Sequence, residues 1–238
     1  MKSISNVSLL VPALVLALAC MIVPSANADL TGTTPLAPTQ SVFPGLVPPG
    51  TDPGTLLAAE SEPFSFTTTG GTTSGSVDSA VFQETGGTLD FYYQLVNNAT
   101  SASSLARMTA TSFVGFTTGT AVGFRVDGSS LPGGEFVDGS VVPISADMNS
   151  NGSVIGFSFN PPDSAKIAPG SDSNVLVIST DATNFTAGNA SVIDGGSATV
   201  ASYQPSASTV PEPRFYSLLL FVGIVAGAVF YRKRFRAA

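Results

Sequence analysis

Residues 89–95, LDFYYQL, carry the alternation that decides the fold class. Successive side chains of a β-strand point to opposite faces, so a strand here would place Leu89, Phe91, Tyr93 and Leu95 on one face and Asp90, Tyr92 and Gln94 on the other. The same pattern returns over residues 155–159, directly after Asn151-Gly152. Residues 175–178 are uniformly apolar, which is typical of a strand covered on both faces.

Further short runs of strand-forming residues are separated by turn residues about every ten positions. We expect strands over residues 76–84, 105–113, 121–126, 137–144, 190–193 and 198–203. With no helical periodicity and no internal repeat between them, residues 64–205 are predicted to form one all-β domain, an antiparallel β-sandwich of jelly-roll or Greek-key type. We expect a helix at each end of the chain: an N-terminal signal helix and a C-terminal transmembrane helix.

Residues 29–63 are predicted to be a Pro-rich linker. The prolines of this stretch are Pro35, Pro38, Pro44, Pro48, Pro49, Pro53 and Pro63. Proline removes a backbone donor and favours extended chain, so little regular structure is expected before Phe64.

The charge distribution excludes one class of partner. The net charge is -7, and every acidic residue lies between Asp29 and Glu212. The same stretch carries only three basic side chains, Arg107, Arg125 and Lys166. Nucleic-acid binding depends on Lys and Arg contacts with phosphate, so no nucleic-acid partner is expected.

Cysteine and histidine usage restricts the chemistry further. Histidine is absent, and the single cysteine, Cys20, lies in the first apolar run. A domain that starts after that run could form no disulfide, thiolate-zinc site or iron–sulfur cluster, and it would lack the commonest general base. No cofactor is expected, apart from the calcium considered below.

Residues 1–28 have the three parts of an export signal. Lys2 supplies the positive start, residues 9–23 are apolar apart from Pro12, and Ala26 and Ala28 are the small residues that signal peptidase inspects. Cleavage is predicted after Ala28. An N-terminal anchor helix and lipidation at Cys20 are the less favoured alternatives.

The other end of the chain combines three features in order. Pro211-Glu212-Pro213 precedes an apolar stretch over residues 215–231, and four basic residues follow within the last seven positions. Seventeen residues at 1.5 Å each give a helix of about 25 Å, just long enough to span a hydrocarbon core. The basic end would remain in the cytoplasm, with the domain outside.

This order resembles the PEP-CTERM sorting signal of exosortase substrates, with the likeness carried by Pro211, Glu212 and Pro213 within the tail 206–238. The resemblance implies export, transient anchoring in the inner membrane of a Gram-negative bacterium, cleavage by an exosortase, and an envelope, biofilm or exopolysaccharide-matrix location. The tail also occurs on some ice-binding proteins, but it does not indicate ice binding. Residues 75–205 resemble unnamed β domains of PEP-CTERM proteins. The alternative is a plain membrane anchor.

Residues 147–152, DMNSNG, are the nearest approach to a metal site. Asp147, Asn149 and Asn151 place oxygen side chains at alternate positions before a glycine, as in the first half of a calcium-binding loop. Ser158 occupies the twelfth position, where such a loop carries a bidentate Glu. An Asn-Gly turn joining two strands is the favoured interpretation.

Three functions follow from these patterns. The first is a non-enzymatic surface or matrix protein. The second is a carbohydrate-binding module for exopolysaccharide, whose aromatic platform would draw on Phe82, Tyr92, Tyr93 and Tyr203. The third and least favoured is a glycoside hydrolase using two carboxyls drawn from Glu84, Asp90, Asp127, Glu135 and Asp138. Arg107 and Arg125 are expected to be surface charges.

Overall fold

The computed structural model describes residues 32–48, 51–123, 130–131, 134–137 and 139–207. Within these ranges the chain is all-β and the strands pair almost entirely antiparallel, as predicted. The described residues include no helix long and apolar enough to span a membrane. The predicted signal segment 1–28 and transmembrane segment 215–231 lie outside the described residues.

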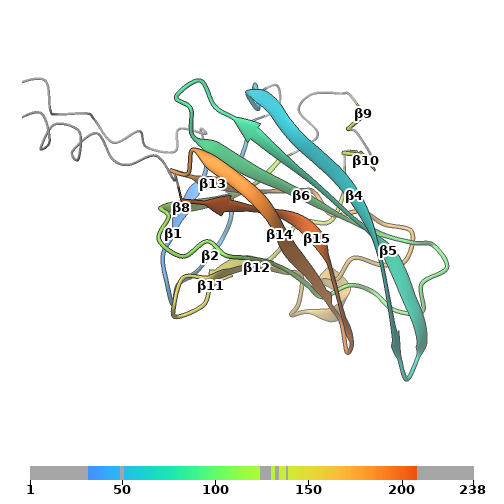
Figure 1. Cartoon of the computed structure of the whole chain (residues 1–238). Helices are drawn as coiled ribbons and strands as arrows, with labels where there is room; N and C mark the ends of the chain where they lie inside the picture. The colour runs from blue at the N-terminus through green and yellow to red at the C-terminus, as the bar shows by residue number, and fades with distance from the viewer. Residues whose placement is uncertain (1–31, 49–50, 124–129, 132–133, 138, 208–238) are drawn as a thin grey trace, which may run out of the picture.

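Two large sheets face each other (Figure 1). Sheet A has the order β1 (Thr34–Leu36), β8 (Thr118–Gly123), β13 (Val175–Thr180), β6 (Leu89–Asn97), β5 (Gly71–Gln83) and β4 (Thr55–Thr68), and β3 (Gly45–Leu46) pairs with β8 in parallel. Sheet B has the order β15 (Ser197–Ser206), β14 (Asn184–Ile193), β7 (Arg107–Thr111), β12 (Val154–Ser158), β11 (Ser145–Met148) and β2 (Ser41–Val42). A short pair, β9 (Ser130–Leu131) and β10 (Gly134–Glu135), and a 3-10 turn, η1 (Asp163–Ala165), complete the described elements.

The main core lies between the two sheets. Sheet A contributes alternate residues of β6, including Phe91 and Leu95, and sheet B contributes Met108, Ile155 and Phe157. All of these side chains are fully buried. The apolar face predicted from residues 89–95 is therefore confirmed as the inner face of sheet A.

The opposite face of β6 differs from the sequence expectation. Asp90, Tyr92 and Gln94 are buried too, because a second apolar cluster covers the outer face of sheet A. Val47, from the segment after β3, and Phe136, from the segment after β10, supply this cover. The prediction that residues 175–178 are covered on both faces is confirmed, since every residue of β13 is buried.

The expected strand over residues 137–144 is wrong. Val141 forms an isolated bridge with Ser173. Around it, individual backbone hydrogen bonds join residues 140–141 to residues 172–174 without forming a continuous ladder. Pro143 has no N–H to contribute to a ladder, and the regular strand β11 begins only at Ser145.

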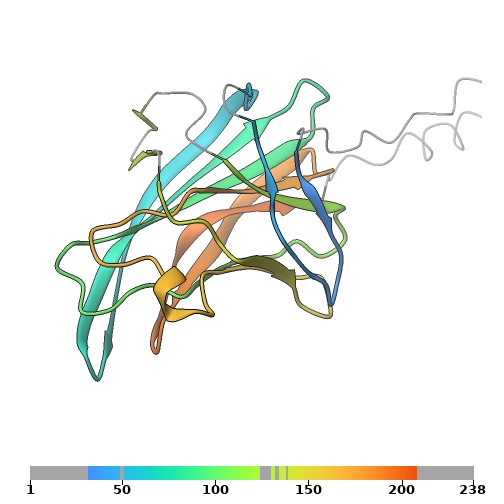
Figure 2. The same ribbon diagram turned by 180° about the vertical axis from the view of Figure 1, so that it is seen from behind.

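The expectation of little regular structure in residues 29–63 is also wrong. β1, β2, β3 and the first half of β4 all fall within it. The segment from β1 to β3 pairs with sheet A, then with sheet B, then with sheet A again, so it joins the two sheets along one edge (Figure 2). The prolines mark edge strands rather than disorder: Pro35 lies in β1 and Pro63 in β4, which are the two ends of the sheet A order.

Candidate functional site

The loop from β11 to β12 carries the three residues considered as calcium ligands, for which a turn was the favoured interpretation. Asp147 lies at the end of β11, and both of its carboxylate oxygens accept hydrogen bonds from the guanidinium of Arg107 on β7. Gly156 of the intervening strand β12 makes room for this contact, because a Cβ added there would lie 2.0 Å from an Arg107 nitrogen. Arg107 is therefore an ion-pair partner within sheet B.

The two asparagines of the loop are used locally. Asn149 Oδ1 accepts a hydrogen bond from the Val154 amide at 3.1 Å, and Asn151 Oδ1 accepts from the Ser153 amide at 3.0 Å. Gly152 has a φ of +74°, a conformation that favours glycine. The favoured interpretation as a turn between two strands is confirmed, and a calcium ion here would have to displace each of these bonds and the Arg107 contact.

The predicted processing residues cannot be placed. Ala26 and Ala28 of the signal cleavage site and Pro211, Glu212 and Pro213 of the sorting motif lie outside the described residues. Arg125, Asp127 and Asp138 do too. Glu135 belongs to β10, but its side chain is not among those described.

The aromatic residues considered for sugar binding do not form an exposed platform. Phe82, Tyr92 and Tyr93 are each at most 3% exposed. The Phe82 and Tyr92 rings pack 4.8 Å apart on the outer face of sheet A, while the Tyr93 hydroxyl donates to the Tyr203 carbonyl at 2.8 Å across the main core. These side chains stabilise the fold, because apolar cover lies over both faces of the central strand.

Two of the carboxyls considered for acid–base chemistry do come together. Glu84 directly follows the last residue of β5, and its carboxyl forms a hydrogen bond with the carboxyl of Asp90 on β6. Burial, followed by the adjacent Glu84 carboxyl, raises the pKa of Asp90 to about 9. Asp90 is fully buried, so this pair lacks the solvent access that a hydrolase cleft requires.

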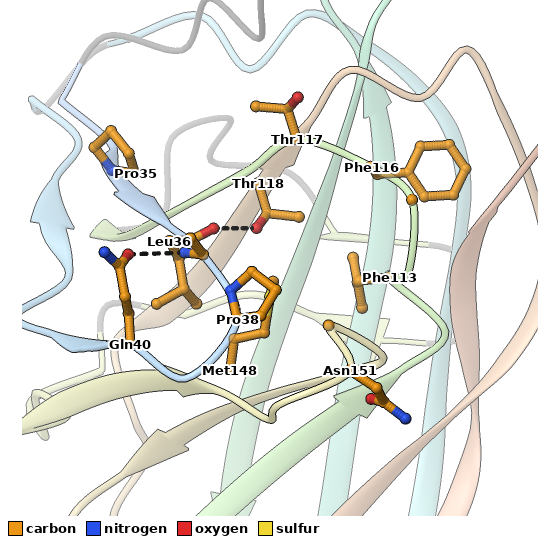
Figure 3. A pocket seen from close by; sticks show the side chains of 13 residues that line it. Pro35, Leu36, Pro38, Gln40, Phe113, Phe116, Thr117, Thr118, Met148 and Asn151 are labelled. Atoms are coloured by element: carbon orange, nitrogen blue, oxygen red, sulfur yellow. Dashed lines mark hydrogen bonds between the residues drawn. The ribbon is translucent and has the colours of Figure 1, made fainter.

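A pocket of about 440 Å³ opens at one edge of the sandwich. It lies between the β1–β2 turn, the loop after β7 and the β11–β12 loop, and Leu36, Pro38, Phe113 and Met148 form its walls (Figure 3). The Gln40 side chain accepts a hydrogen bond from the Ala37 amide rather than pointing across the opening.

Neither the protein-family models nor the curated proteins nor the solved structures include a match to this chain.

Proposed function

We propose that this chain is a non-enzymatic exported protein of the cell surface or biofilm matrix of a Gram-negative bacterium, processed by signal peptidase and then by an exosortase. The observation that carries the proposal is the position of β15. The last strand of the described residues, β15, ends at Ser206, and Pro211-Glu212-Pro213 begins five positions later. Four residues of extended chain reach at most about 14 Å, so a cut at the motif would release the whole sandwich with almost no appendage.

The positions of the first and last described strands, β1 and β15, support the same proposal. β1 and the end of β15 lie at the same end of the sandwich in both views (Figures 1 and 2). The export segment and the sorting tail therefore attach at one end. Before processing, an inner-membrane anchor over residues 215–231 would hold the domain with its opposite end facing away from the membrane.

The acidic side chains support a non-enzymatic role. Asp147 is paired with Arg107, while Asp163 and Asp194 both lie within 3.0 Å of the Lys166 ammonium. Asp90, one of the carboxyls considered for hydrolysis, is fully buried in sheet A beside the partly buried Glu84. The ion pairs help to stabilise the domain, and its negative net charge favours solubility outside the cell.

The strand order supports a jelly-roll or Greek-key connection. Several neighbours are non-consecutive in the chain, as in β1-β8-β13-β6 of sheet A and β14-β7-β12 of sheet B, so the chain crosses repeatedly between the sheets. Exopolysaccharide binding is the alternative function. It is less well supported now that three of its four candidate aromatics are buried.

Fractionation of the native host tests the proposal. Wild-type protein should appear at the surface or in the matrix, and a variant with Pro211, Glu212 and Pro213 changed to Ala should accumulate in the inner membrane. A glycan array with the same protein separates the two functions, because saturable binding to one polysaccharide class would favour the alternative. Wild-type protein found only in the inner membrane would contradict the proposal.

A further inference from the structure

The loop between β11 and β12 contains the one Asn-Gly pair of the sequence, Asn151-Gly152. Every other asparagine of the chain is followed by a residue that carries a Cβ. The Asn151 side chain is exposed, and Gly152 has a φ of +74°. Because glycine has no Cβ, its backbone nitrogen can approach the Asn151 side-chain carbon Cγ with less steric hindrance than any other pair in the chain allows.

Two hydrogen-bond donors converge on one oxygen of this asparagine. The Ser153 amide donates to Asn151 Oδ1 at 3.0 Å, and the Ser153 hydroxyl donates to the same oxygen at 2.6 Å. Donors placed in this way stabilise the negative charge that an amide oxygen acquires when a nucleophile adds to its carbon. Asn151 Cγ is therefore activated towards attack.

Ser153 is held in place from outside the turn. Its carbonyl accepts hydrogen bonds from the amides of Ser112 at 2.6 Å and of Phe113 at 3.3 Å, in the loop after β7. Its hydroxyl also accepts a hydrogen bond from Asn149 Nδ2 at 3.1 Å. The two donors are positioned before any reaction begins, which is the condition for this kind of stabilisation to be effective.

We propose that Asn151-Gly152 is a site of spontaneous modification, at which the exported protein converts an asparagine to aspartate and isoaspartate. The hydrogen bond from the Gly152 N–H to the Asn149 carbonyl, 3.1 Å long, opens first. The Gly152 nitrogen gives its proton to water and forms a bond to Asn151 Cγ, the negative charge falls on Oδ1, and the bond from Cγ to Nδ2 breaks as ammonia leaves with a proton from water. One water molecule then opens the resulting succinimide ring, so the net reaction consumes water and releases ammonia.

The products alter the turn in two ways. Both add a negative charge at position 151, and isoaspartate also routes the main chain through Cβ, which lengthens the turn by one atom. Asn151 and Gly152 help to line the pocket beside the β1–β2 turn, so the modification changes the charge at its rim (Figure 3). This inference does not depend on the sorting tail.

Incubation of the full-length protein at pH 8 in ¹⁸O-labelled water tests the site. Peptide mapping should locate isoaspartate, loss of ammonia and one labelled oxygen at position 151. Asn149 is the internal control, because it is exposed in the same loop but is followed by Ser150. Its Oδ1 accepts a hydrogen bond from the Val154 amide, and it should remain unmodified.

Two substitutions at Ser153 separate the effect of the donors from that of the Asn-Gly sequence. Ser153→Ala removes the hydroxyl donor and should slow the reaction of the folded protein by about threefold or more, less than the loss from a fully buried donor. Ser153→Thr keeps a hydroxyl and should react at about the rate of wild type. In concentrated urea, where the turn is absent, all three chains should react equally fast. The Tm of each variant shows that it is folded.

Two results would overturn the proposal. One is a folded wild-type protein that stays unmodified while the urea-unfolded chain reacts to completion, because the turn would then protect Asn151. The other is a folded Ser153→Ala variant that reacts as fast as wild type or faster, because the Ser153 hydroxyl would then not activate Asn151.

Discussion

The guanidinium of Arg107 on β7 reaches across strand β12 and binds both carboxylate oxygens of Asp147 on β11. The contact passes over Gly156, and its two side chains are each about a third exposed. It links three strands of sheet B through one ion pair. The same contact occupies Asp147, which the sequence had offered as a calcium ligand in the less favoured of two interpretations.

A double-mutant cycle tests this relationship. Asp147→Asn should reduce the free energy of unfolding by about 1 kcal/mol in wild type, since a two-pronged Arg–carboxylate pair is stronger than a simple surface pair. In a Gly156→Ala background the added methyl group displaces the guanidinium, so the same substitution should cost almost nothing. Urea unfolding measures both values.

Gly86→Ala is the control for that cycle, because a Cβ added at Gly86 meets no atom within 4 Å. Asp147→Asn should keep its full cost in the Gly86→Ala background. An equal cost in the Gly156→Ala background would show that Arg107 does not pass over Gly156.

Residues 34–46, which were expected to be part of a linker, should contribute to the stability of the domain because they pack into its core. Leu36 of β1 is 4% exposed, whereas Leu57 of β4 is 42% exposed. Leu36→Ala should therefore lower the free energy of unfolding by about 2–4 kcal/mol, and Leu57→Ala by less than about 0.5 kcal/mol. Chemical denaturation of the two variants, which carry the same substitution, provides the measurement. Equal effects would mean that residues 34–46 do not belong to the fold.

The domain should become more stable as the pH falls from 8 to 5. Burial raises the pKa of Glu60, Asp78, Asp90 and Asp172, so the folded state binds protons more tightly than the unfolded state. The stability is then fully present below the unfolded values near 4 and is lost as the pH rises through the folded values. We expect a loss of about 1 kcal/mol per pH unit, measured by urea unfolding.

Asp90→Asn should reduce this pH dependence, because it removes the most strongly shifted carboxyl. The variant should be more stable than wild type at pH 8 and lose that advantage near pH 5. A wild-type stability that rises with pH over this range would contradict the buried, protonated state of the pair.

The sequence predicted the fold class because periodicity is a local property. The alternation over residues 89–95 placed Phe91 and Leu95 on the core face correctly, and the unbroken apolar run over residues 175–178 indicated a central strand. The cover on the outer face of sheet A could not be predicted, because Val47 and Phe136 come from irregular segments without a period. The proline-rich composition led us to place the start of the domain at Phe64, which is too late in the chain, because edge strands tolerate proline.

The contacts between polar side chains could not be predicted from the sequence for a different reason. Glu84 and Asp90 are six positions apart around a turn, and their carboxyls meet only because Gln83 pairs with Leu89. A hairpin register fixed from the turn residues 84–88 could have revealed the pair. The partnership of Arg107 with Asp147 depends on strand order in sheet B, which local pattern does not specify.

Intact mass of the mature protein, purified from its native host, tests the central claim most directly. The account predicts loss of residues 1–28 and of the tail beyond the sorting motif, with the tail retained when Pro211, Glu212 and Pro213 are changed to Ala. Retention of residues 214–238 in both forms would contradict it and would make the C-terminal segment a simple membrane anchor.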